Sequence, residues 1–142
     1  MNRLHKVILF FLLLFALLGM ADSGYLLYEH LGGDSPVCIV GEGCGIVTQS
    51  VYSEIAGVPI ALVGFLYYII FFSLSVWFII KESARPINIL RVLLTLGLIF
   101  STWLVYLQVF VIESICFYCI VSATLTLLSF ALIWFLKPVE LK

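Results

Sequence analysis

The chain contains four cysteines, and they fall into two closely spaced pairs. Cys116 and Cys119 form a C-x-x-C motif, whereas Cys38 and Cys44 flank a stretch that contains glycines. Residues three apart lie on one face of a helix, so the sulfurs of the first pair can meet where a helix begins. The glycines give the second pair backbone freedom. A mobile pair beside a rigid pair suits thiol–disulfide exchange, which proceeds through mixed disulfides and needs movement and access.

The composition indicates a membrane protein. Hydrophobic residues make up 64% of the 142 residues, charged residues make up 11%, and the mean hydropathy is +1.25. A soluble domain is about half apolar and about a quarter charged. Seven basic and eight acidic residues leave a net charge of −1, so no overall basic field attracts nucleic acid. These values exclude a soluble enzyme, a disordered tail and a nucleic-acid binder.

Apolar runs divide the chain into four predicted membrane spans, at about 7–28, 60–80, 92–112 and 114–136. Each is near the roughly 20 residues that a helix needs to cross the hydrocarbon layer. The first run also fits a cleaved signal peptide, with a basic start and a small-residue site ending at Ala21. Apolar residues resume after Ala21, which favours a retained helix. We therefore expect an all-α integral membrane protein, a four-transmembrane-helix bundle forming one domain over 1–142.

The basic residues orient the predicted bundle. They precede the first span, separate the second from the third, and follow the fourth: Arg3, Lys6, Lys81, Arg85, Arg91, Lys137 and Lys142. The positive-inside rule places these regions, and both termini, in the cytoplasm. All four cysteines then lie on the outer side of a multi-pass cell-membrane protein, where disulfides persist.

The outer loop between the first two spans carries a possible short helix. Val47, Val51 and Ile55 recur every four residues within Gly45–Ala56, which predicts a short interfacial helix over the outer mouth of the bundle. Glu54 interrupts this stripe, so an irregular loop is the alternative.

The cysteines have two structural alternatives. Four cysteines can form two static disulfides in any of three pairings, or bind one zinc ion as a Cys₄ site. Ser114 is a candidate N-cap that would put Cys116 in the first turn of the last helix. The helix dipole there favours a thiolate, whereas burial in lipid opposes it, and the sequence leaves this balance open.

Together these features resemble the vitamin K epoxide reductase family in its stand-alone prokaryotic form. The resemblance covers nearly the whole chain. It rests on the four predicted spans, the loop pair with Ser50 six residues after Cys44, the Gly57-Val58-Pro59 segment before a helix containing Gly64, and the C-x-x-C that opens the last span.

The resemblance implies a quinone-dependent thiol–disulfide oxidoreductase that supports disulfide formation outside the cytoplasm. Cys38 and Cys44 would take electrons from a thioredoxin-like partner, expected to be a separate periplasmic or extracellular chain. Cys44 would form a transient bridge to Cys116, and Cys119 would contact the quinone, menaquinone or ubiquinone. Ser50 matches a residue near the quinone carbonyl. No metal is expected.

Two aromatic residues are further candidates for the quinone pocket, and one acid is a separate functional candidate. Phe100 and Trp103 would lie opposite the last span and line an apolar pocket, although ordinary helix packing or the aromatic belt is the commoner explanation for either residue taken singly. Asp22 is an acid inside a span, and such acids are functional candidates by default. Its position near the outer end of its span also fits a solvated acid.

Two other assignments compete with this one. The disulfide-bond protein B family performs similar chemistry, but its C-x-x-C lies in the first outer loop rather than at the start of the last span. A non-catalytic four-helix membrane scaffold with structural disulfides is the alternative of a different class. Ala123 stands where animal relatives have Tyr, so the resemblance supports quinone reduction and leaves epoxide reduction open.

Overall fold

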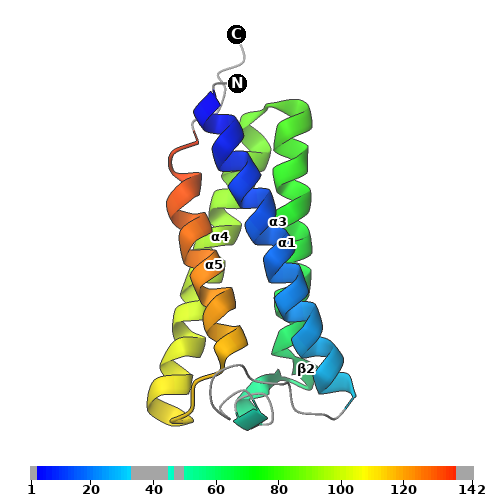
Figure 1. Cartoon of the computed structure of the whole chain (residues 1–142), viewed down its shortest axis with the longest axis vertical. Helices are drawn as coiled ribbons and strands as arrows, with labels where there is room; N and C mark the ends of the chain where they lie inside the picture. Colours follow the sequence, from blue (N-terminus) through cyan, green and yellow to red (C-terminus); the bar gives the residue numbers. More distant parts are fainter. Residues whose placement is uncertain (1–2, 33–44, 47–49, 137–142) are drawn as a thin grey trace.

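The computed structural model describes residues 3–32, 45–46 and 50–136, and in this part of the chain four long helices form an antiparallel bundle (Figure 1). They are α1 (Arg3–Leu31), α3 (Ile60–Lys81), α4 (Ala84–Tyr106) and α5 (Phe117–Ile133). A π-helical turn, η2 (Leu107–Val111), continues α4. Helix α1 packs against α3 and α5, and α4 packs against the same two helices, so the four form a closed ring.

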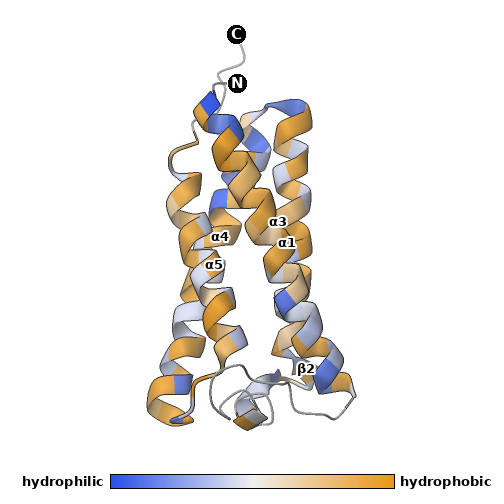
Figure 2. Ribbon diagram, viewed as in Figure 1, coloured by the Kyte–Doolittle hydropathy of each residue, from blue (hydrophilic) through white to orange (hydrophobic). Residues whose placement is uncertain are grey.

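Three of the helical segments are long and apolar enough to cross a membrane: Arg3–Leu31, Ile60–Lys81 and Ala84–Val111. Helix α5 is apolar but has only 17 residues. The outer surface is apolar along all four helices (Figure 2), and Phe10, Ile99 and Phe135 are each more than 60% exposed. Such a surface is stable in lipid rather than in water, which confirms the prediction of a membrane protein.

Helix α4 begins before the predicted boundary at residue 92. The prediction excluded charged residues, whereas the helix includes Arg85 and Arg91. Arg91 is accommodated because its Nη2 donates a hydrogen bond to the carbonyl oxygen of Leu136 at 2.6 Å. Its guanidinium also lies 5.1 Å from the centre of the Trp134 ring, a favourable cation–π contact.

The predicted helix over Gly45–Ala56 is wrong for the residues from 51 onward. A 3₁₀ turn, η1 (Val51–Ser53), leads into a small antiparallel hairpin of β1 (Glu54–Ile55) and β2 (Val58–Pro59). Ala56 and Gly57 turn the chain with φ angles of 52° and 82°. The apolar repeat fails because it buries nothing: Val51 is 85% exposed. Residues 47–49 lie outside the described part.

The two ends of the bundle differ in their polar groups. The end with the chain termini carries the described basic residues, on the first turn of α1 and around the α3–α4 connection (Figures 1 and 2). At the other end, His30 Nε2 and Glu54 Oε1 lie 2.9 Å apart and join α1 to the hairpin. The side of the membrane that each end faces stays a prediction.

The main core fills the half of the bundle nearer the termini, which we call the closed half. Its buried residues come from all four helices and the segment after α5: Ile8, Leu9, Leu12, Ala16, Tyr68, Phe71, Leu74, Phe78, Ile87, Leu90, Leu94, Ile133 and Leu136. The ring of Tyr68 occupies the space where a side chain at Gly19 would lie. The absence of a side chain at Gly19 therefore lets α1 and α3 approach closely.

Candidate functional site

The C-x-x-C motif lies at the start of α5. Cys116 is the N-cap residue, with φ −91° and ψ 121°, and the helix begins at Phe117. The expectation that Ser114 is the N-cap is therefore wrong, and the last helix begins later than residue 114. Cys116 is fully buried, and Cys119 packs against it one turn into the helix. The sulfur of Cys116 lies near the backbone amides of Tyr118 and Cys119, although it does not form a side-chain capping hydrogen bond.

Gln108 holds the motif in place, and the sequence analysis missed it. Its side-chain Oε1 accepts a hydrogen bond from the backbone N–H of Cys116 at 3.0 Å. Its backbone oxygen accepts another from the N–H of Ser114, also at 3.0 Å. The Gln108 side chain is 2% exposed. One residue thus fixes the segment that leads into α5.

The π-helical turn aims Gln108 at this segment. The N–H of Ile112 bonds to the oxygen of Leu107 at 2.7 Å, the five-residue step of a π-helix. Such turns occur as local distortions of α-helices, frequently at functional sites. Glu113 then adopts a left-handed φ of 58°, which reverses the chain between η2 and α5.

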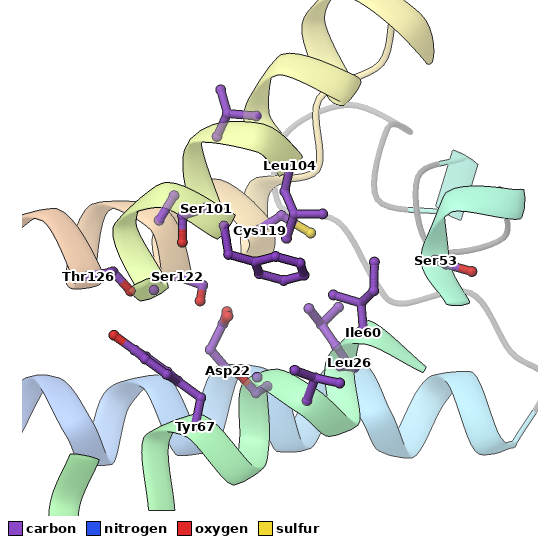
Figure 3. Close-up of a pocket in the computed structure, with 18 of the residues that line it drawn as sticks. Asp22, Leu26, Ser53, Ile60, Tyr67, Ser101, Leu104, Cys119, Ser122 and Thr126 are labelled. Carbon is purple, nitrogen blue, oxygen red and sulfur yellow. The ribbon is translucent and has the colours of Figure 1, made fainter. Parts of the chain in front are cut away.

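A cavity of about 280 Å³ lies beside the motif, in the half of the bundle away from the termini, and we call this the hollow half. All four helices line it, together with the segment around η1. Figure 3 shows Ser101, Cys119, Ser122 and Asp22 bordering the same space. Most of the lining is apolar, which is typical of a small-molecule site with a few orienting polar groups.

Tyr68 closes the cavity toward the closed half. Its hydroxyl, on α3, donates to the carbonyl oxygen of Ser122 on α5 at 2.9 Å. It also lies 2.8 Å from Ser122 Oγ and 3.3 Å from Thr126 Oγ1. The neighbouring Tyr67 hydroxyl lies close to Thr126 but has no partner of standard hydrogen-bond geometry among the described residues.

Asp22 brings a carboxylate to the cavity from α1. Its Oδ2 is buried and makes no hydrogen bond within the described part of the chain. The carboxylate interacts electrostatically with Cys116 and Cys119. Buried polar groups are nearly always hydrogen-bonded, so this arrangement calls for an explanation.

A model of the vitamin K epoxide reductase family matches residues 10–134. The chain belongs to the vitamin K epoxide reductase family. Over 131 residues it is 31% identical to the thiol-disulfide oxidoreductase LTO1 of Arabidopsis thaliana. The matched region covers 87% of this chain and 34% of that relative. The chain thus spans about a third of the relative's length. Family membership confirms the resemblance inferred from the cysteine pattern.

Within this vitamin K epoxide reductase-family chain, the structure brings together part of the predicted site. Cys119, Ser50 and Phe100 all line the cavity. Cys116 is buried beside Cys119. Cys38 and Cys44 lie outside the described residues, so their relation to the motif stays a prediction.

Trp103 is the predicted pocket residue that the structure leaves outside the lining. Trp103 is 45% exposed, and its ring centre lies 5.9 Å from that of Phe100 with the two rings tilted by 36°. Phe100 and Leu104 share the lining face, whereas Trp103 is rotated by about 100° from Leu104 around the helix. The expectation that both aromatic residues line the pocket therefore applies to Phe100 alone. No group of three or more His, Cys, Asp or Glu side chains suited to a metal ion occurs among the described residues.

Proposed function

We propose that the chain is a membrane thiol oxidoreductase that passes electrons from a thioredoxin-like partner to a quinone. Electrons enter at Cys38 and Cys44, move to Cys116 and Cys119, and leave to the quinone. The observation that carries this proposal is the position of Cys119, which lines a largely apolar cavity and contacts a buried second cysteine. Family membership and the thiol–disulfide chemistry named for LTO1 support the same activity.

The first transfers are exchanges between thiols and disulfides. A thiolate attacks a disulfide sulfur, forms a mixed disulfide and displaces the other sulfur as a thiolate. In this proposal Cys44 forms that transient bridge with Cys116. Because Cys116 is fully buried in the described structure, the start of α5 must open for the bridge to form. The hydrogen bond from its amide to Gln108 is the contact that we expect to hold the closed arrangement.

The last transfer oxidises the C-x-x-C dithiol and reduces the quinone. Two S–H bonds break and one S–S bond forms, which releases two electrons and two protons. The quinone takes up both and becomes a quinol. The cavity volume of about 280 Å³ is near the lower end of the roughly 300–1,000 Å³ of small-molecule sites. It suits the ring of menaquinone or ubiquinone, whose apolar tail then extends into lipid, with Phe100 and Ser50 beside the ring.

We propose the membrane orientation that follows from the basic residues. Both termini lie in the cytoplasm, and the end of the bundle that carries Cys116 and Cys119 faces outward. A separate periplasmic or extracellular partner then reaches the loop cysteines, and the quinone arrives through the bilayer. This orientation is tested by labelling the reduced protein with a membrane-impermeant thiol reagent in intact and in permeabilised cells. Cysteines that react only after permeabilisation would lie on the cytoplasmic side and contradict it.

A thiol count tests the activity itself. The protein is reduced in detergent without oxygen, a soluble quinone is added, and free thiols and quinol are measured over time. We expect two thiols to disappear for each quinol formed. Unchanged thiols would contradict the oxidoreductase and support the scaffold with structural disulfides.

A cysteine variant tests the order of the relay. Cys44→Ala is expected to abolish turnover with a protein dithiol while Cys116 and Cys119 are still oxidised by quinone. Normal turnover by this variant would show that electrons do not pass through Cys44.

A further inference from the structure

Oxidation of the C-x-x-C pair requires a group that takes up protons. Both S–H bonds break as the disulfide forms, and the quinone oxygens must gain protons to give the quinol. Cys116 is fully buried, and Cys119 is partly buried and lines the cavity. A proton carrier inside the cavity removes the need for bulk water at the reacting atoms.

Asp22 is the carboxylate that lines this cavity among the described residues. It comes from α1, and Figure 3 shows it across the space from Cys119 and Ser122 of α5. Its Oδ2 is buried and has no hydrogen-bond partner in the described structure. An acid within an apolar helix is costly, and this one lacks the pairing that a purely structural acid has.

The other groups around Asp22 are weaker candidates. The titratable groups that face it are Cys116, Cys119 and Tyr118 around the start of α5, and Tyr68 on α3. Tyr67 of α3, His30 of α1 and Tyr52 of η1 line the same cavity. Ser101 and Gln108 contribute uncharged polar groups from α4 and η2. The Tyr68 hydroxyl is hydrogen-bonded to Ser122, and the His30 ring is hydrogen-bonded to Glu54. Among these described groups, only Asp22 has a carboxylate that can accept a thiol proton and an oxygen without a hydrogen-bond partner.

We propose that Asp22 is the proton carrier of this site, an inference that rests on the proposed quinone-linked function. Its carboxylate accepts the proton of the Cys119 thiol, directly or through one water molecule. As the S–S bond to Cys116 forms, two electrons pass to the quinone. Asp22 then gives its proton to a quinone oxygen, and the proton lost by the Cys116 thiol supplies the second. The carboxylate is regenerated, so protons and electrons balance.

Single-turnover kinetics test this role. The protein is reduced in detergent, mixed with a soluble quinone, and the quinol absorbance is followed from acid to alkaline pH. We expect Asp22→Asn to lower the rate by about 100-fold, the typical contribution of one acid–base group. We also expect the loss of the rate increase that accompanies ionisation of Asp22, whereas the increase from thiol ionisation persists. Asp22→Glu should restore part of the rate and the pH dependence.

Two measurements separate proton transfer from a structural role. Glu29→Gln makes the same chemical change on the same helix outside the cavity lining, and it should leave the rate unchanged. With Asp22→Ala, added formate or acetate should raise the rate, because a small acid can enter the vacated space. If Asp22→Asn does not fold, the Asp22→Glu profile and this rescue decide the question.

The outcomes distinguish this inference from the proposed function. If the unaltered protein reduces no quinone, the proposed function fails. If it reduces quinone and Asp22→Asn keeps both the rate and the pH profile, Asp22 carries no proton. A variant that changes only the KM for quinone, with an unchanged profile and no rescue, would overturn the inference in favour of a binding role.

Discussion

The closed half and the hollow half of the bundle are built from the same four helices but treat their buried polar groups differently. In the closed half, Arg91 Nη2 donates a hydrogen bond to the Leu136 carbonyl oxygen, although Arg91 Nε is buried without a partner among the described residues, and Ser75 bonds within its own helix to Phe71. In the hollow half, Asp22 Oδ2 and the Tyr67 hydroxyl are buried without hydrogen bonds among the described residues. Two of the three buried side-chain polar atoms without a hydrogen-bond partner in the described part of the chain therefore belong to residues that line the cavity beside Cys119, where a ligand can pair with them.

The sharpest way to break this comparison is to remove the sulfur that opens onto the cavity. Cys119→Ser should lower the rate of quinol formation to background, because a serine hydroxyl cannot form a disulfide. The free energy of unfolding should fall by only about 1 kcal/mol, because Cys119 is partly buried and lies outside the main core. Quinone assays and equilibrium unfolding in mixed micelles measure the two effects. Quinol formation above background by this variant would show that another sulfur reacts with the quinone.

Phenylalanines in the two halves make a matched pair. Phe71 is fully buried in the closed half, and Phe71→Ala should cost about 3 kcal/mol, at the low end of the range for soluble cores. The low end is expected because lipid tails solvate apolar side chains nearly as well as the core does.

Phe100→Ala, which enlarges the existing cavity, should cost about 1 kcal/mol or less and raise the KM for quinone. Unfolding in mixed micelles and quinone titration give both values. Equal losses of stability would contradict a division into closed and hollow halves.

Gln108 tests how firmly the hollow half holds the motif. Gln108→Leu leaves the buried N–H of Cys116 without its acceptor, which should cost about 2 kcal/mol. Alkylation of Cys116 should become faster as the start of α5 opens. Thr102→Val is the control, because its exposed hydroxyl bonds only within its own helix. The interpretation fails if both variants behave alike.

The smallest effect should come from two adjacent tyrosines. Tyr68→Phe removes the hydroxyl that bonds to Ser122 and should lower the free energy of unfolding by about 1 kcal/mol. Tyr67→Phe removes a hydroxyl without a standard hydrogen bond, so stability should stay the same or rise slightly. Unfolding measurements on both variants decide this, and a larger loss for Tyr67→Phe would reverse the assignment.

The sequence predicted the helices better than their ends. Apolar runs locate α1, α3, α4 and α5 because lipid requires long uncharged segments with every backbone group satisfied. The start of α4 was missed because Arg91 is stabilised by Leu136 and Trp134, residues distant in sequence. The hairpin around Gly57 was missed because a short turn leaves little trace in hydrophobic periodicity.

The site was predictable where chemistry requires a particular residue type. The cysteine spacing and family resemblance selected Cys119, and the position of Asp22 within a span marked it as unusual. Gln108 escaped notice because one polar residue in an apolar run has no distinctive spacing. Its importance depends on the π-helical turn and on a backbone amide, neither of which a side-chain pattern reveals.

The shortness of α5 links this chemistry to the lipid around it. At 17 residues the helix is about 25 Å long, less than the roughly 30 Å of hydrocarbon in a typical bilayer. Figure 1 shows that α5 begins short of the end of the α4–η2 segment beside it. Such a hydrophobic mismatch is relieved when the bilayer thins locally around the helix or when the end of the segment lies below the membrane surface. Bilayer thickness is thereby expected to set how far the dithiol lies from water, so lipids of different chain length should tune turnover without any change in the protein.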